Sequence, residues 1–175
     1  FPVVVDIGFQ GMQSSFNNFS DLCSLARIDG YSINNKHDAD DIINNQMVKN
    51  GFRIISVSQR LFNTEIIDLE KDNYIENNQG GTYKYSDGDD LTIVCFNFSF
   101  PHGYELKRRI EKKGCSVALF SCNFIEKHDW SMIYSSLKRT GKLIMIDDSK
   151  SLNQVCFRLE SELNKDLDFQ SLIIN

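Results

Sequence analysis

The sequence has no excess of positive charge and no long apolar run. Nineteen Lys and Arg residues stand against 24 Asp and Glu, giving a net charge of −5, so the basic surface on which nucleic-acid binding depends is not expected. No segment reaches the roughly 18 to 20 apolar residues of a membrane span, and the first residues do not follow the pattern of a signal peptide. The sequence therefore predicts a cytoplasmic protein with neither nucleic acid nor membrane as a partner.

The sequence also has little that is typical of a metal site or a disulfide. Its five cysteines are odd in number, lie mostly in apolar segments and show no CxxC spacing, which is typical of free thiols packed as small apolar side chains. His37, His102 and His128 have no partner at metal-ligand spacing. Each is near the start of a predicted helix, where a surface or capping role is favoured over catalysis.

What is present is an alternation of strand and helix patterns. The 175 residues are 41% hydrophobic, enough for one domain or two small ones. In the first part we predict strands over residues 2–7, 31–34 and 52–57, with helices capped by Ser20 and Asp38. The apolar spacing of Ala39, Ile42, Ile43 and Met47 predicts one buried helix face.

The second part is more regular. Predicted strands cover residues 91–96, 116–122 and 142–146, and each is followed by a helix with a single apolar stripe. Between residues 63 and 90 the periodicity fades, which indicates a linker. The sequence thus predicts an α/β protein of two modules of mostly parallel sheet flanked by helices, with boundaries at 1–62, 63–90 and 91–175.

Ligands of such sheets gather at the carboxyl ends of the strands, and the loop over residues 8–18 is the richest candidate. Gln13, Ser14 and Asn17 offer neutral hydrogen-bonding groups beside Phe9 and Phe16, which can stack on a ring. The alternative is an ordinary polar loop. The loop lacks GxGxxG and the lysine of a P-loop, so a phosphate cradle is not indicated.

A second candidate is the acidic pair Asp147 and Asp148 at the end of a predicted strand. The pair can bind Mg²⁺ or cap the following helix, and the sequence shows no third ligand.

Several segments resemble transketolase-like, thiamine-diphosphate enzymes, and the beta subunits of 2-oxoacid dehydrogenases most closely. The segments of the first part are residues 2–6, 12–15, 21–27, 29–33 and 38–40, which resemble the second half of a pyrimidine-binding domain. Residues 88–94 and 137–148 resemble the linker and the C-terminal domain, in which a helix end, a glycine and a hydrophobic strand run into an acidic pair. Because the chain opens on a strand, we expect part of the first domain to lie upstream or on another chain.

The resemblance implies a partner and a cofactor. In that family the diphosphate and Mg²⁺ are bound by a separate domain or subunit through a GDG motif, and a glutamate of the pyrimidine-binding domain activates thiamine diphosphate. Residues 87–90 are not GDG, and the glutamate is expected upstream of Phe1. A histidine common in the loop after the first strand is replaced by the stretch 13–16.

These departures leave three hypotheses. The first is a component of a thiamine-diphosphate enzyme that transfers a two-carbon or acyl unit, active only with a partner that carries the diphosphate-binding site. There Gln13, Ser14 and Asn17 assist the reaction, and Phe9 and Phe16 contact the cofactor. The second is a non-catalytic assembly or regulatory subunit. Both predict self-association. The third is an unrelated flavodoxin-like binding domain.

Overall fold

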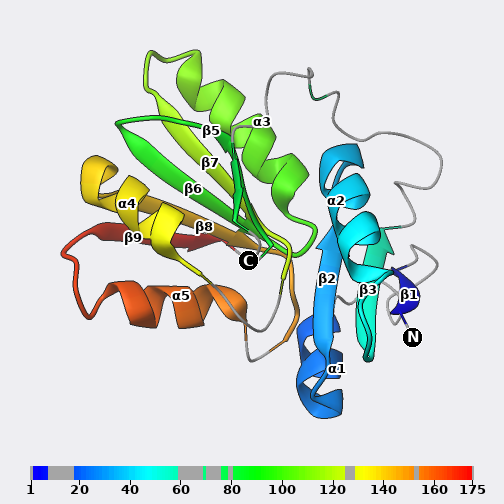
Figure 1. Cartoon of the computed structure of the whole chain (residues 1–175). Helices are drawn as coiled ribbons and strands as arrows, with labels where there is room; N and C mark the ends of the chain where they lie inside the picture. Colours follow the sequence, from blue (N-terminus) through cyan, green and yellow to red (C-terminus); the bar gives the residue numbers. More distant parts are fainter. Residues whose placement is uncertain are drawn as a thin grey trace.

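The computed structural model describes residues 2–7, 18–58, 69, 76–78, 81–124, 129–151 and 154–174. They form two parallel-dominated sheets flanked by helices (Figure 1), as the sequence predicted. We call residues 2–58 the first module and residues 76–174 the second module. No helix in the described ranges is long and apolar enough to cross a membrane.

The first module is a three-stranded parallel sheet in the order β1-β3-β2. Its elements are β1 (Pro2–Ile7), α1 (Phe19–Ala26), β2 (Asp29–Ile33), α2 (Lys36–Gln46) and β3 (Arg53–Ser58). β1 ends at Ile7, which pairs with Ser58 at the end of β3. The last residue of β1 therefore lies at the carboxyl edge of the sheet.

The second module is a six-stranded sheet in the order β4-β5-β7-β6-β8-β9. Its elements are β4 (Glu76–Asn78), β5 (Thr82–Ser86), β6 (Leu91–Phe96), α3 (Phe100–Glu111), β7 (Val117–Cys122), α4 (Ser131–Thr140), β8 (Lys142–Asp147), α5 (Val155–Leu163) and β9 (Gln170–Ile174). The run β7-β6-β8-β9 is parallel, and β5 joins β7 antiparallel. The sequence analysis did not predict β9, nor β4 and β5, which form within the residues assigned to a linker.

Two apolar clusters form the core, one on each face of the larger sheet. One contains α4 and α5 side chains such as Ile133, Leu137 and Leu159. The other contains Phe100 of α3, and Figure 1 shows α3 on the side of the sheet opposite α4 and α5. Each cluster also contains residues of the first module. The two modules therefore share their cores instead of folding around separate ones.

The two helices of the first module begin at other residues than the sequence predicted. α1 begins at Phe19 after Asn18, whose side chain makes no capping hydrogen bond, and Ser20 lies inside the helix instead of capping it. α2 begins after Asn35, and Asp38 is its third residue.

The predicted buried face of α2 is also wrong. Ile42 is buried, but Ile43 is 45% and Met47 51% exposed, and Asp38 and Gln46 are buried in their place. Polar contacts of Asp38 orient this helix. A pattern of apolar residues in the sequence does not reveal such contacts.

Candidate functional site

The carboxyl ends of strands from both modules meet at one place. At the end of β2 in the first module, the backbone N–H of Ser32 donates to the carbonyl of Asn123, which follows β7, at 2.8 Å. The Asn123 amide donates back to the Ser32 carbonyl at 2.8 Å. The Ser32 hydroxyl donates to the carbonyl of Asn97, which follows β6, at 3.2 Å. We call this meeting of strand ends the strand-end site.

Asp38 accepts several hydrogen bonds at the strand-end site and is 0% exposed. Its carboxylate accepts from the backbone N–H groups of Asn34 and Asn35, while the Asn35 side chain accepts from the N–H of Asp38 at 3.1 Å. This reciprocal capping box fixes the start of α2. The Asn123 amide also donates to the same carboxylate. A helix start in the first module is thereby tied to a strand end in the second.

Asn97 and Asp147 form the second pair of the site. Asn97 has a φ of 56°, a left-handed conformation that Asn tolerates better than most residues. Its amide donates to Asp147 Oδ1 at 2.7 Å, and the N–H of Ser149 donates to the same oxygen at 3.0 Å. Asp147 is 0% exposed, and its Oδ2 has no hydrogen-bond partner among the described residues.

Burial raises the pKa of the Asp147 carboxyl above its usual value, although its hydrogen bonds with Ser149 and Asn97 act to lower it. The Cys156 thiol lies beside it, and burial together with this carboxyl raises the pKa of Cys156 to about 12. The Cys156 thiol is therefore protonated at neutral pH and does not act as a nucleophile in that form, and the Asp147 carboxyl holds its proton to a higher pH than an exposed carboxyl does.

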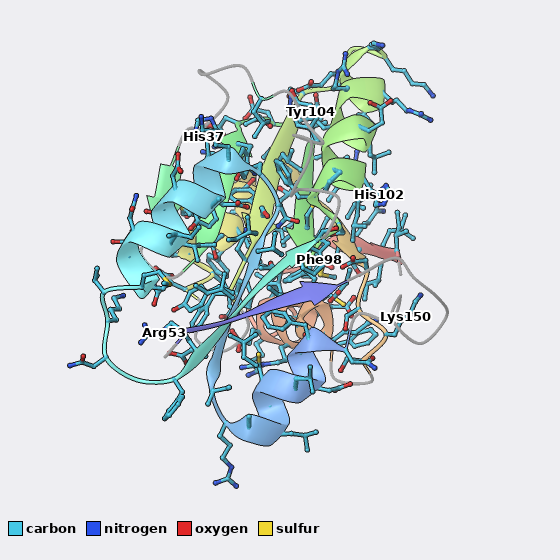
Figure 2. The ribbon with its side chains drawn as sticks, turned by 90° about the vertical axis from the view of Figure 1, so that its right-hand side faces the viewer. His37, Arg53, Phe98, His102, Tyr104 and Lys150 are labelled. Carbon is cyan, nitrogen blue, oxygen red and sulfur yellow. The ribbon has the colours of Figure 1, made fainter. Side chains whose placement is uncertain are left out.

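The loops after β6 and β8 are also joined, since Asp148 accepts from the N–H of Phe98 at 3.0 Å. His102 lies in the first turn of α3, where its side chain is exposed. In Figure 2 Phe98, His102 and Lys150 lie toward the end at which β1 terminates, whereas Arg53 lies near its start. This agrees with the register, because Arg53 pairs with Pro2 at the first position of β1.

The predicted site residues Gln13, Ser14 and Asn17, with Phe9 and Phe16, lie outside the described residues. Of the described residues, Ile7 at the end of β1 and Asn34 just after β2 lie at the same carboxyl edge of the sheet. Asp147 and Asp148 bind neighbouring backbone and amide groups, and no group of three or more His, Cys, Asp or Glu able to hold a metal ion occurs in the described ranges.

Asn34, Asn97 and Asn123 were not predicted as site residues, although the sequence contains a signal for them. Each follows directly on the last residue of a parallel strand, and Asp147 is the last residue of another. An amide or carboxyl side chain at the carboxyl end of several buried strands indicates a shared polar edge. The partners across the two modules are far apart in sequence, so only the structure shows which of these side chains meet.

Residues 80–153 match the family model described as Transketolase, C-terminal domain. A search of curated protein sequences found no significant match. Among solved structures, the chain is similar over 99% of its length to one described as a split gene transketolase, inactive beta4 tetramer, with a TM-score of 0.74 and 10% identity.

Two further similar structures, each also aligned over 99% of this chain, are a transketolase from Campylobacter jejuni, with a TM-score of 0.64 and 13% identity, and a transketolase mutant from Pichia stipitis, with a TM-score of 0.60 and 12% identity. The chain spans 56%, 27% and 25% of the three structures' lengths. At these identities the likeness shows a shared fold, so closeness to a 2-oxoacid dehydrogenase beta subunit is not established. The second module has the fold of a transketolase C-terminal domain.

Proposed function

We propose that this chain is a component of a transketolase-like, thiamine-diphosphate-dependent enzyme, and that it works only with a partner that carries the diphosphate-binding site. The observation that carries the proposal is that both modules together follow the transketolase fold over 99% of the chain. The reaction is the transfer of a two-carbon or acyl unit, either as in transketolase or as in a 2-oxoacid dehydrogenase.

The described residues do not themselves fit a magnesium diphosphate. The carboxylate of Asp38 accepts from Asn34, Asn35 and Asn123, and Asp147 and Asp148 accept from neighbouring amide groups. Hard cations need several oxygen ligands directed at one point, and these residues offer none. A partner must therefore supply them.

In this proposal the segment that follows β1 contacts the substrate and the cofactor. β1 ends at the carboxyl edge of its sheet, where ligands of parallel sheets bind. We propose that Gln13, Ser14 and Asn17 hydrogen-bond the reacting carbonyl compound and that Phe9 and Phe16 pack against the cofactor. In this proposal residues 1–62 are part of a pyrimidine-binding-type domain, 63–90 link the domains, and 91–175 are the C-terminal domain.

Exposed apolar side chains support a partner surface on the first module. Leu25 of α1 is 84% exposed, Val48 after α2 is 81% exposed, and Phe52 before β3 is 69% exposed. Large exposed apolar groups on one module are typical of surfaces that another protein covers. We propose that the diphosphate-binding partner and a second copy of the chain cover this module.

The test is reconstitution of the chain with a partner that carries a GDG-type diphosphate site. We expect turnover of a ketose phosphate or a 2-oxo acid by the complex and none by either part alone. The triple substitution Gln13→Ala, Ser14→Ala and Asn17→Ala is expected to lower kcat/KM by at least tenfold, whereas the exposed Asn164→Ala leaves it unchanged.

The alternative is a non-catalytic assembly or regulatory subunit with the same fold. It is favoured if the complex forms and its activity is unchanged by the triple substitution. Absence of activity in a complex that binds thiamine diphosphate would likewise support this alternative over the proposal.

A further inference from the structure

A cavity of about 360 Å³ lies where α2 of the first module meets β5 of the second. The α2 side contributes Asp41, Asn45 and Gln46, with Lys49 just beyond the helix, and Tyr83 comes from β5. Its volume falls in the range of about 300 to 1,000 Å³ that is common for small-molecule sites. None of these lining residues takes part in the hydrogen bonds described for the strand-end site.

The two ends of the cavity carry opposite charges. Asp41 lies within α2 and Lys49 lies in the turn three residues beyond the last helical residue, Gln46, so the two charges come from opposite ends of the segment that lines the cavity. The negative end is fixed in place, because the Tyr83 hydroxyl donates to Asp41 Oδ2 at 2.7 Å. The Asn45 amide donates to Asp41 Oδ1 at 2.7 Å.

Arg53 adds positive charge near the other end. Its guanidinium donates to the backbone carbonyls of Gln46, Lys49 and Asn50, and the residue is only 4% exposed. This contact holds the turn that carries Lys49 against the end of α2. The cavity therefore has an acidic end at Asp41 and a basic end at Lys49.

Two buried polar groups line the space between these ends. Gln46 is 7% exposed, and its side-chain amide makes no hydrogen bond with the part of the chain that the structure describes. Tyr31 is 8% exposed, and burial, with Asp29 nearby, raises its pKa to about 12, so its hydroxyl remains a donor at neutral pH. No polar atom of either side chain is among the buried atoms that lack a partner, and both residues line the cavity, so their polar groups are available to hydrogen-bond a ligand there.

We propose that this cavity binds a small zwitterion, an amino acid whose ammonium and carboxylate groups are separated by a short chain. The ammonium group binds Asp41, the carboxylate binds Lys49, and Gln46 and Tyr31 hydrogen-bond the ligand between them. Because the walls come from both modules, the bound molecule holds α2 against β5 and stabilises the interface between the modules.

The test compares three probes of nearly equal size. 5-Aminopentanoate carries both charges, pentanoate only the negative one and pentylamine only the positive one. Binding to the full chain is followed by NMR through the backbone amides of Asn45, Gln46 and Tyr83. We expect 5-aminopentanoate to bind at least about tenfold more tightly than either single-charge probe, since each charged contact adds about that factor.

Two substitutions test which side chain binds each charged group of the ligand. Asp41→Asn keeps an acceptor for Tyr83, and we expect it to remove the preference for 5-aminopentanoate over pentanoate. Lys49→Gln is expected to remove the preference over pentylamine. The exposed Lys113→Gln is the control and leaves all three affinities unchanged. Thermal unfolding of each variant establishes that it is folded.

Three results would overturn the proposal: no saturable binding of 5-aminopentanoate, equal affinity for all three probes, or an unchanged preference in both folded variants.

Discussion

The two modules bury their apolar side chains to very different extents. In the second module, Leu137 of α4 is 1% exposed and Leu159 of α5 is 0% exposed. In the first module, Leu25 of α1 is 84% exposed and Ile43 of α2 is 45% exposed. Helices of similar length therefore contribute very different amounts of buried area, and the hydrophobic contribution to folding is concentrated in the second module.

Besides the apolar side chains that it adds to the shared cores, the first module is held by polar contacts with the second. Asp38, Asn123 and Ser32 are buried and join α2 and β2 to the ends of β6 and β7. Buried polar networks of this kind specify one arrangement, because each group left without a partner costs free energy. The comparison shows that the first module adds buried hydrogen bonds to the few apolar side chains, such as Phe19 and Ile42, that it places in the shared cores.

The largest effect is expected from a substitution that disrupts the packing of the second module. Leu137→Ala removes a fully buried side chain, and we expect it to lower the free energy of unfolding by about 3 to 4 kcal/mol. Leu25→Ala is the matched substitution in the first module and is expected to change it by no more than about 0.5 kcal/mol. Urea denaturation followed by circular dichroism measures both. Equal losses would contradict the difference between the modules.

A smaller effect is expected from breaking the polar contact. Asn123→Ala leaves the Ser32 carbonyl and the Asp38 carboxylate without the amide that bridges them, which we expect to cost about 2 to 3 kcal/mol. Hydrogen exchange should increase in β2 and α2 more than in β6 and β8. The exposed Asn164→Ala is the control. A uniform increase across both sheets would show that Asn123 does not specifically position the first module.

The smallest expected effect concerns pH and Asp147. The raised pKa of this carboxyl in the folded chain means that its contribution to stability is greatest below the unfolded value of about 3.9. It is lost as the pH rises through the folded pKa. Asp147→Asn keeps an acceptor for Asn97 and removes the charge, so we expect about 1 kcal/mol of added stability at neutral pH.

This gain should disappear as the pH falls toward 4. Denaturant midpoints measured across the pH range check it, with the exposed Asp166→Asn as the control. A gain that stays constant across that range would show that the charge of Asp147 is not the cause.

The sequence predicted the second module well because its helices bury single apolar stripes. Cys156, Leu159 and Leu163 on α5 follow such a stripe, and all three are buried. β9 was not predicted although it extends the sheet beside β8. Its Leu172 is 54% exposed, and an exposed edge strand carries little of the pattern that marks a core strand.

The sequence predicted the first module less well because contacts with the second decide its arrangement. The burial of Asp38 depends on Asn123, which lies 85 residues further along the chain, and no local pattern contains that information. The strand-end site was predicted only as an edge of the sheet. Its particular residues could be identified only from the contact between the two sheets. The roles of the residues in the loop over 8–18 stay predictions.

The most direct test of the proposed division of labour is calorimetric titration of thiamine diphosphate with Mg²⁺ into the chain alone and into its complex with the diphosphate-binding partner. The account predicts no binding to the isolated chain and saturable binding to the complex. Tight binding to the chain alone would contradict it, because the cofactor site would then belong to this chain.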